Sequence, residues 1–377
     1  MEATDETGAM RKTGAMRKMR AVHSSHSSHS SHNSHNSHSS HNSEPWKSPE
    51  LQPSQPIPHS TFHIPHYLCI TGPTACGKTR RAVALARHLD AEIISADSRQ
   101  VYRNMDIGTG KDLDEYGDTP YHLIDIADAG EKYNLYRYLQ DYDAAYADIR
   151  RRGRNAILCG GTGMYLEAVL SGLRLPEVPV NATLRDSLSG CTLPQLTERL
   201  ASMKTMHNTT DVDTVARAIR AIEIETYYLE HPEAAQAVRV DASRRPEALI
   251  ILMDIDRESR RRRISERLRT RLDDGMVEEV RALLDRGVDP ETLLAYGLEY
   301  RYVTLYITGQ MKYAEMVQSL ETAIHQFAKR QMTWFRGMER RGFTLHPIPW
   351  DIPDEDFIAR VEALLQEFPQ PQRPQRP

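Results

Sequence analysis

A glycine-rich segment, GPTACGKT, has the residue types and the spacing of a loop that binds phosphates. It matches the pattern G-x-x-x-x-G-K-[ST] and lies between an apolar run at 67–71 and a helical pattern at 79–89. In such a loop the backbone N–H groups turn inward and the following helix adds positive potential, while Lys78 supplies a charge and the Thr79 hydroxyl can bind Mg²⁺. The segment therefore predicts a polyphosphate site with a magnesium ion. The residues of this predicted site are Gly72, Pro73, Thr74, Ala75, Cys76, Gly77, Lys78 and Thr79.

Two further polar segments follow apolar runs in the same way. The segment DSRQ, from Asp97 to Gln100, follows a run at 92–96, and GGTG, which contains Thr162, follows another at 156–159. In open α/β sheets the ligand crevice lies at the carboxyl ends of the strands, so these side chains are candidates for a second substrate. Taken alone, Asp97 fits a helix cap as well as it fits a ligand contact.

Apolar runs and helical patterns alternate along the chain from residue 66, which indicates the elements that position these segments. The apolar runs lie at 67–71, 92–96, 121–126, 156–160 and 248–255. Strands separated by helices form a mostly parallel sheet covered on both faces. We therefore expect an α/β fold, a P-loop NTPase-like parallel sheet with helices on both faces. Helical patterns at 193–203 and 215–230 add a helical insertion domain, and the chain after Asp256 is expected to be mainly helical.

The composition divides the chain into segments. Histidine recurs every third residue from His23 to His41 among serine and asparagine, which predicts disorder; the tract could bind a transition metal or carry no site at all. The expected segments are a disordered extension at 1–62, the first part of the core at 63–175, the insertion at 176–245, the second part of the core with basic helices at 246–347, and a terminal helix with a Pro/Gln/Arg tail at 348–377.

Charge and cysteine content narrow the class of protein. The chain has a formal net charge of −4, and no apolar run is long enough to cross a membrane, so we expect a cytoplasmic protein without a membrane partner. Its basic residues gather in two stretches, at 244–271 and 329–341, which could meet phosphates. No pair of cysteines has zinc-ligand spacing, which argues against a structural metal and for a reducing compartment; the cysteines are Cys69, Cys76, Cys159 and Cys191.

Taken together in order, these segments resemble the tRNA dimethylallyltransferases, also called tRNA isopentenyltransferases. The matching motifs are GPTACGKT, DSRQVYRNMDIGTGKD, PYHLIDI, GGTGMYLEAVLSG, RAIRAIEI and AKRQMTWFR, which together cover about 66 to 345. The resemblance implies transfer of a dimethylallyl group from dimethylallyl diphosphate to N6 of adenine 37 in tRNAs that read codons beginning with U. No zinc-finger pattern follows the last motif, which favours the bacterial type, and nothing in the sequence demands an oligomer.

The resemblance also implies roles for individual residues. Asp97 would take a proton from the adenine amine, and Lys78, the loop amides and Mg²⁺ held through Thr79 would stabilise the departing diphosphate. Arg263 and Arg267 match an arginine pattern near the diphosphate, and the resemblance does not decide between them. The residues implied in tRNA binding are Asp97, Ser98, Arg99, Gln100, Thr162, Arg217 and Arg220.

Several positions depart from the family pattern, and other functions stay open. Cys76 replaces a serine, Gly110 and Asp112 replace Ala and Pro, and Tyr121 replaces a histidine. The segment AYGLEYRYV differs from the commoner Val-Gly-Tyr-Arg pattern, which puts the local contacts there in doubt.

The alternative functions are an adenylate isopentenyltransferase, a small-molecule P-loop kinase, and an RNA-binding module without catalysis. For Trp334 and Phe335, stacking on RNA bases and packing in the core are both open, and we favour the core.

Overall fold

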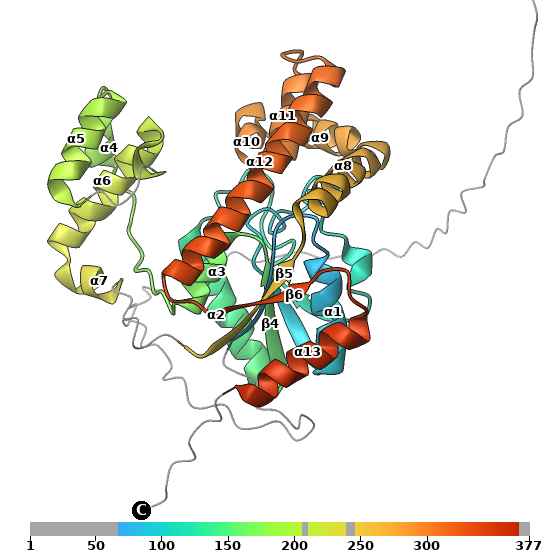
Figure 1. Cartoon of the computed structure of the whole chain (residues 1–377). Coiled ribbons are helices and arrows are strands. Elements are labelled where there is room, and N and C mark those ends of the chain that lie inside the picture. Colours follow the sequence, from blue (N-terminus) through green and yellow to red (C-terminus); the bar gives the residue numbers. More distant parts are fainter. Residues whose placement is uncertain (1–66, 206–209, 239–245, 369–377) are drawn as a thin grey trace, which may run out of the picture. The chain divides into compact units, whose positions relative to one another are not determined.

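A computed structural model describes residues 67–205, 210–238 and 246–368, and the centre of this part is a parallel β-sheet (Figure 1). Within these residues the sheet has six strands in the order β3-β2-β4-β1-β5-β6, and every neighbouring pair is parallel. The strands are β1 Tyr67–Thr71, β2 Ala91–Ser95, β3 Tyr121–His122, β4 Asn155–Gly160, β5 Ala248–Asp254 and β6 Leu345–Pro349.

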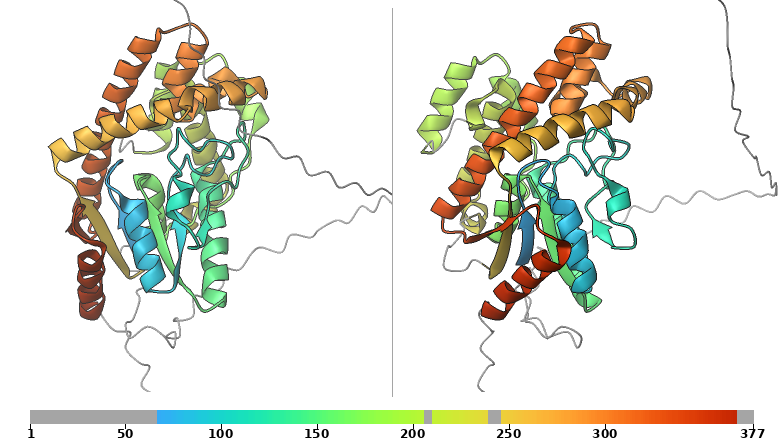
Figure 2. Two further views of the ribbon diagram at one scale, coloured as in Figure 1. Left: turned by 90° about the vertical axis from the view of Figure 1, so that its right-hand side faces the viewer. Right: turned by 45° about the vertical axis from the view of Figure 1, so that its right-hand side comes forward.

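Helices cover both faces of this sheet. Along β1, Leu68 and Ile70 point to the face covered by α1 (Lys78–His88) and α13 (Asp354–Glu367). Tyr67 and Cys69 point to the opposite face, which is covered by α2 (Leu135–Arg151), α3 (Gly163–Leu170) and the end of α12 (Tyr313–Arg340). Both layers are visible in Figures 1 and 2. The predicted α/β fold with a P-loop-type parallel sheet is therefore confirmed.

The sheet order brings the polar segments together at the carboxyl ends of the strands. Strand β1 lies between β4 and β5, and β2 lies on the other side of β4. Because all these strands are parallel, the loops after β1, β2 and β4 leave the sheet at the same end. These loops are the glycine-rich segment, the DSRQ segment and the GGTG segment.

One predicted strand is shorter than expected, and one strand was not predicted. The run at 121–126 forms strand only at Tyr121–His122, because Leu123 and Asp125 adopt left-handed φ angles of 62° and 57°. The region after Asp256 also contains a strand, β6, which pairs with β5 at the edge of the sheet. Its sequence LHPIP contains two prolines, which an edge strand tolerates because one side of its backbone needs no sheet hydrogen bonds.

A group of helices packs beyond the carboxyl ends of the strands (Figure 2). They are α8 Arg257–Asp273, α9 Met276–Asp285, α10 Pro290–Ala295, α11 Leu298–Ile307 and the first part of α12. Their buried side chains, such as Tyr300 and Leu320, enclose Val101 and Met105 from the loop that follows the DSRQ segment. This packing fixes a long loop that contains little regular structure of its own, η1 Leu113–Glu115.

The segment between β4 and β5 contains a second set of helices with its own core. They are α4 Ala182–Leu188, α5 Leu193–Met203, η2 Thr210–Val212, α6 Val215–Glu230 and α7 Pro232–Ala237. Helices α5 and α6 coincide with the patterns predicted at 193–203 and 215–230, and residues such as Leu196, Leu200 and Ile222 form a separate buried cluster. The residues before and after this helical segment lie next to each other, because a Cβ built on Gly172 would lie 3.4 Å from Pro246 Cδ.

A buried carboxylate ties α4 to α6, and we expect it to make this helical segment sensitive to acid. Burial raises the pKa of Glu223, but hydrogen bonds from Arg185, Arg220 and the Asn181 N–H outweigh this effect and lower the pKa from 4.5 to about 2. A lowered pKa stabilises the folded state above the unfolded value, and this contribution is lost as pH falls through the folded value.

We therefore expect acid unfolding to take up a proton at Glu223 between about pH 4.5 and pH 2. In Glu223→Gln, the free energy of unfolding at pH 7 should be lower than in the wild type. When the free energy of unfolding is plotted against pH, the curves of the two proteins should converge near pH 2. Denaturant titrations followed by circular dichroism across this pH range measure the difference. Parallel curves would show that the carboxylate charge is not what holds α4 to α6.

Several expectations fall outside the described residues, including the histidine tract, the rest of 1–62 and the Pro/Gln/Arg tail at 369–377. Among the described residues, no helix combines the length and the apolar character needed to cross a bilayer.

Candidate active site

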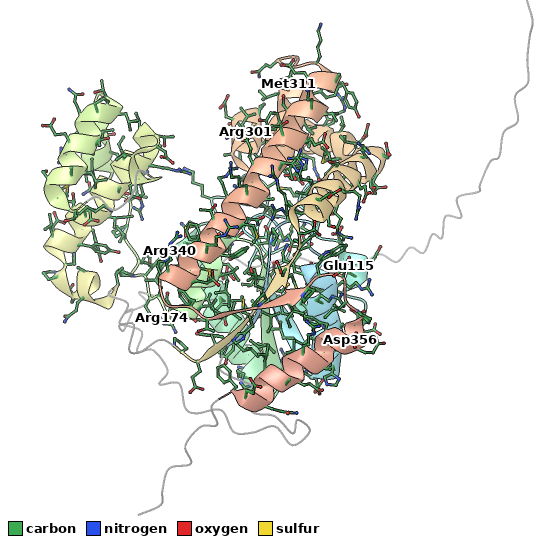
Figure 3. All side chains as sticks on the ribbon, viewed as in Figure 1. Glu115, Arg174, Arg301, Met311, Arg340 and Asp356 are labelled. Atoms are coloured by element: carbon green, nitrogen blue, oxygen red, sulfur yellow. The ribbon has the colours of Figure 1, made fainter. Side chains whose placement is uncertain are left out.

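A cavity of about 710 Å³ lies at the carboxyl ends of the strands, where the predicted segments meet. Its walls come from the glycine-rich loop, the DSRQ and GGTG segments, and helices α8, α11 and α12. Among the side chains drawn in Figure 3, Glu115 from η1 and Arg301 from α11 belong to this lining. The predicted residues that line the cavity are Thr74, Ala75, Gly77, Lys78, Thr79, Asp97, Ser98, Arg99, Gln100, Thr162, Arg263 and Arg267.

The glycine-rich loop has the backbone of an anion site. Gly77 adopts φ 79° at the start of α1, and no side chain caps that helix, so its first N–H groups are left for a ligand. Gly72 allows a close approach, because a Cβ there would lie 2.8 Å from Cys76 Sγ. In the part of the chain that the structure describes, the Lys78 ammonium and the Thr79 hydroxyl form no hydrogen bond or ion pair with protein, so both can serve a ligand.

The ends of β2 and β4 are held together beside this loop. A Cβ on Gly160 would lie 2.3 Å from the Ala96 carbonyl oxygen, so only glycine fits there. The Thr162 N–H donates to that same carbonyl at 3.1 Å, and the Thr162 hydroxyl accepts from the Ser98 N–H at 3.0 Å. One oxygen of Asp97 accepts from the Arg99 N–H at 2.9 Å, so the carboxylate is oriented by its own turn. The structure thus brings Asp97, Ser98 and Thr162 into one cluster.

Gln100 differs from its neighbours because its side chain is already committed to protein. It is buried, its Oε1 accepts from the Ser95 hydroxyl at 3.1 Å, and its Nε2 donates to the Gly110 carbonyl at 3.0 Å. The side chain therefore fixes the loop that ends at Gly110, and its contact with tRNA stays a prediction.

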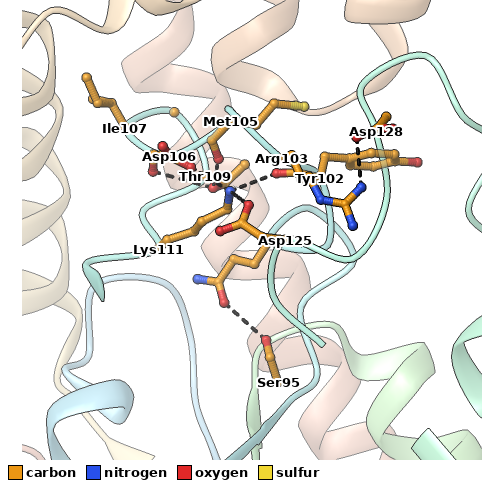
Figure 4. A network of polar contacts seen from close by, with 12 residues as sticks. Ser95, Tyr102, Arg103, Met105, Asp106, Ile107, Thr109, Lys111, Asp125 and Asp128 are labelled. Carbon is orange, nitrogen blue, oxygen red and sulfur yellow. Dashed lines mark hydrogen bonds and ion pairs between the residues drawn. The ribbon is translucent and has the colours of Figure 1, made fainter. Parts of the chain in front are cut away.

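A buried lysine that the sequence reasoning did not select organises the same loop (Figure 4). Lys111 is 1% exposed, and its ammonium donates to the Tyr102 carbonyl at 2.7 Å, to Asp106 at 2.6 Å and to Asp125. A buried ammonium with three oxygen partners is held firmly because each partner compensates its lost hydration. Lys111 lies at the end of the motif MDIGTGK, but its partners cannot be read from the sequence.

A carboxylate from α9 holds the middle of this loop. Glu279 accepts hydrogen bonds from the backbone N–H groups of Asp106, Ile107 and Gly108 at 2.8, 2.7 and 3.0 Å. The Tyr300 hydroxyl donates to the same carboxylate. Successive N–H groups that converge on one anion form a strong charge-assisted contact. Glu279 thus connects the helical group to the loop that forms one wall of the cavity.

Replacing Glu279 should loosen that wall. Glu279→Ala leaves three loop N–H groups without their acceptor, and we expect the free energy of unfolding to fall by about 2 kcal/mol. Glu279→Gln keeps the shape and one acceptor oxygen and should lose less. Urea unfolding measures the stability, and limited proteolysis at 105–112 reports on the loop. Equal midpoints and equal cleavage for all three proteins would contradict this role.

Two arginines of α8 reach the glycine-rich loop from the opposite side. Arg263 Nε donates to the Ala75 carbonyl at 2.8 Å, and its guanidinium lies 4.6 Å from the centre of the Trp350 ring. Arg267 donates to the Thr74 hydroxyl. Burial and, second, the charge of Arg271 lower the pKa of Arg267 to about 10, so it is still a cation at neutral pH. Both predicted arginines therefore contact the loop.

A glutamine of α12, which the sequence reasoning missed, joins two of the loops. The Thr74 N–H donates to Gln331 Oε1 at 2.8 Å, and Gln331 Nε2 donates to the Gly161 carbonyl at 2.9 Å. Gln331 therefore sets the spacing between the glycine-rich loop and the GGTG segment. The available signal was a polar residue on the buried face of a helix, in the motif AKRQMTWFR.

The neighbouring aromatic residues of α12 have different environments. Phe335 is 1% exposed and packs against the sheet, which confirms the expectation of a core residue. Trp334 is 41% exposed and lines the cavity, so the same expectation was wrong for Trp334. The helix turns by about 100° per residue, which separates the two side chains.

The segment AYGLEYRYV, which departs from the family pattern, also reaches the cavity. It spans the turn between α10 and α11 and the first part of α11, and it contributes Gly297 and Glu299 to the lining. Burial raises the pKa of Glu299, and the charges of Arg271 and Arg267 oppose this effect. This carboxylate is therefore an additional polar group that a ligand in the cavity can meet.

The structure does not bring the two arginines of α6 to the cavity. Arg217 pairs with Asp213 at 2.7 Å on the surface of the insertion. Arg220 donates to Glu223 and to the Val178 carbonyl. Their contact with tRNA stays a prediction.

Comparison with known proteins agrees with these features. Residues 100–338 match the family model described as IPP transferase, and residues 65–118 match the model described as Isopentenyl transferase. The chain is 57% identical over 312 residues to tRNA dimethylallyltransferase 2 of Bacteroides fragilis, which covers 81% of this chain and 100% of that protein. It is 58% identical over 302 residues to tRNA dimethylallyltransferase 1 of Parabacteroides distasonis, which covers 79% and 97%.

Solved structures show the same fold. The full-length tRNA isopentenylpyrophosphate transferase of Bacillus halodurans superposes with a TM-score of 0.58 at 28% identity, over 80% of this chain and 97% of that one. A eukaryotic dimethylallyltransferase acting on tRNA shares the fold with a TM-score of 0.66 at 23% identity, over 81% of each chain. On the evidence of its motifs, its fold and its relatives, the chain belongs to the IPP transferase family.

Proposed function

We propose that the protein transfers a dimethylallyl group from dimethylallyl diphosphate to N6 of adenine 37 in tRNAs that read codons beginning with U, and releases diphosphate. The observation that carries the proposal is the single cavity in which the glycine-rich loop faces Asp97. Relatives that match this chain over nearly their whole length are named tRNA dimethylallyltransferases. A tRNA substrate would place the reaction in the cytoplasm.

The donor half of the cavity suits a diphosphate. Lys78, the N–H groups at the start of α1 and the two arginines of α8 supply positive charge around the glycine-rich loop. An allylic diphosphate leaves readily once its growing negative charge is stabilised. The loop therefore acts on a leaving group, and no nucleotide hydrolysis is needed.

The same residues fit a magnesium ion. The Thr79 hydroxyl lines the cavity beside Lys78 without a protein partner among the described residues. Magnesium in phosphate sites takes few protein oxygens and fills its other positions with water and phosphate oxygens. Thr79 would hold the ion, which when bound would neutralise part of the diphosphate charge.

The acceptor half of the cavity suits a purine base. The adenine N6 forms a bond to the first carbon of the donor, the bond from that carbon to the diphosphate oxygen breaks, and the N6 proton passes to the Asp97 carboxylate. Asp97 is oriented for this role by the Arg99 N–H. Ser98 and Thr162, which bond to one another, lie where they can contact the base.

The size of the cavity requires the adenine to leave the RNA stack. A volume of about 710 Å³ can hold a prenyl donor with one base, but not a folded RNA loop. Extruding one base from a loop costs a few kcal/mol of unstacking, which binding of the flanking nucleotides can offset. The enzyme would act as a monomer, because the predicted catalytic residues already meet in one cavity.

A transfer assay tests the function directly. The purified protein with Mg²⁺ and radiolabelled dimethylallyl diphosphate is offered unmodified tRNA in one reaction and AMP in another. We expect label on tRNA, and none when guanosine replaces adenine 37. Label on AMP would instead indicate an adenylate isopentenyltransferase. Label on neither, together with binding of ATP in preference to the prenyl donor, would indicate a kinase.

A further inference from the structure

A third arginine of α8 lines the active-site cavity beside Arg263 and Arg267. Arg271 follows Arg267 by four residues, as Arg267 follows Arg263, so the three side chains lie on one face of the helix. Arg263 and Arg267 are bonded to the glycine-rich loop. Arg271 lies one turn further along, against the loop that contains Gly110. The helix therefore presents a row of three guanidinium groups to the cavity.

The guanidinium of Arg271 is buried, yet it donates no hydrogen bond to protein among the described residues. The Arg271 side chain is 9% exposed. Its ion-pair partner Asp112 lies 3.9 Å away and has a side chain that is 52% exposed, so the pair is long and weakened by water. A guanidinium has five N–H donors, and leaving them unpaired in a buried place is costly. The arrangement therefore suits an anion that enters the cavity.

Gly110 leaves the space that this guanidinium occupies. A Cβ built on Gly110 would lie 1.6 Å from Arg271 Nη2, so any larger residue there would displace the guanidinium. The loop is firmly held on its other side. The Gly110 carbonyl accepts from Gln100 Nε2 at 3.0 Å, and the ammonium of the next residue, Lys111, is bonded to three oxygens (Figure 4). The guanidinium is thus fixed between α8 and this loop.

Three positions at which the chain departs from the family pattern surround Arg271. Gly110 and Asp112 stand where Ala and Pro are usual. When the pattern Val-Gly-Tyr-Arg is aligned on Gly297, its arginine falls on Glu299, a cavity residue whose carboxyl interacts electrostatically with Arg271. In this chain the positive group beside position 299 therefore comes from α8. The three departures fit together as the surroundings of one side chain.

The neighbouring arginines repel each other when no ligand is present. Burial and, second, the charge of Arg271 lower the pKa of Arg267, so the two guanidinium groups lie close together. A polyanion between two such cations relieves both their repulsion and their loss of hydration. Four residues of helix advance about 6 Å, a span that the two phosphates of one diphosphate can bridge with the help of the long arginine side chains.

We propose that Arg271 binds the diphosphate of the prenyl donor, as a further phosphate-binding residue in line with Arg263 and Arg267. The inference rests on the proposed function and adds a residue to its donor site. The guanidinium donates charge-assisted hydrogen bonds to phosphate oxygens. These bonds strengthen as the bond to the allylic carbon breaks and negative charge grows on the diphosphate. Asp112 holds the side chain at the cavity wall before the donor enters.

Binding of inorganic diphosphate tests the inference without any transfer reaction. In titration calorimetry with Mg²⁺, Arg271→Met should raise the Kd of diphosphate about tenfold, because it removes charge-assisted hydrogen bonds. Arg271→Lys keeps the charge but loses the paired donors, so its Kd should fall between those two values. Arg269→Met is the matched control, since Arg269 is exposed on the same helix and is not part of the cavity lining. It should leave the Kd within about twofold.

A substitution in the loop separates the guanidinium from the loop itself. Gly110→Ala should also raise the Kd of diphosphate, because its methyl group must displace the guanidinium of Arg271. Arg271→Met has no guanidinium to displace, so adding Gly110→Ala to it should change the Kd by less than about threefold. An equal effect of Gly110→Ala in both backgrounds would come from the strained loop and would contradict the inference. Melting temperatures confirm that each variant is folded.

Transfer kinetics identify the phosphate that is bound. In Arg271→Met, kcat/KM for dimethylallyl diphosphate should fall about tenfold while the KM for RNA stays within about twofold. A raised KM for RNA with an unchanged Kd of diphosphate would assign Arg271 to a phosphate of the acceptor and overturn the inference. If the wild type labels no RNA, the proposed function fails, but the Kd of diphosphate in the two proteins still decides the role of Arg271.

Discussion

Asp97→Asn is expected to lower the single-turnover rate of prenyl transfer by about a thousandfold, because it removes the group that accepts the N6 proton. The amide keeps an oxygen that can accept from the Arg99 N–H, so the turn after β2 should survive the change. Binding of tRNA should therefore change by less than about threefold. Rapid-quench kinetics with saturating donor measure the rate, and filter binding measures the affinity.

Asp97→Ala provides the second variant for this prediction. It removes both the base and the local hydrogen bond, so it should be as inactive as Asp97→Asn but less stable. If either variant retained a substantial rate, Asp97 could not be the base, and the acceptor proton would have to leave by another route. A rate that recovers at high pH in Asp97→Asn would likewise point to hydroxide or another side chain as the acceptor.

Lys78→Met is expected to lower kcat by about a hundredfold to a thousandfold, the loss typical when one preorganised group that stabilises transition-state charge is removed. Methionine keeps the length and the helix propensity of lysine at the start of α1. The change should therefore spare the fold. Steady-state rates give kcat, and the inhibition constant of inorganic diphosphate should rise in the same variant.

Arg80→Gln is the matched control for Lys78→Met. Arg80 lies on the same helix, is exposed, and pairs with Asp354 at 3.0 Å, away from the cavity. Its loss removes the same amount of charge two residues further along and should leave kcat and diphosphate inhibition within about twofold. Equal losses in the two variants would mean that net charge, and not the position of Lys78, governs the rate.

The parts of this molecule that could be predicted from sequence are those determined by short-range patterns. The glycine-rich loop requires backbone conformations that only its own residues decide, and Gly77 indeed adopts the left-handed φ that starts α1. The observed bounds of α5 and α6 agree with the predicted ones, because each helix follows a threonine N-cap and has apolar residues at helical spacing. Parallel strands then place Asp97 and Thr162 at one edge without further information.

The parts that were missed depend on partners far away in the chain. Gln331 acts on Thr74 and Gly161, and Glu279 on the loop at 106–108, across separations that no local pattern reports. Strand β6 carries two prolines and forms only because β5 offers an edge. Trp334 was assigned to the core by its apolar character, but its neighbour Phe335 takes that place.

The contact between Gly172 and Pro246 affects how the chain can reach this fold. Strand β5 pairs with β1 only after the whole insertion has intervened, which gives the pairing a high contact order. If α5 and α6 form their own core first and bring Gly172 next to Pro246, the chain that separates β1 from β5 becomes shorter by somewhat less than half. Loop-closure entropy makes that shortening worth about 0.5 kcal/mol in the search. The helical segment can thus speed assembly of a sheet to which it adds no strand.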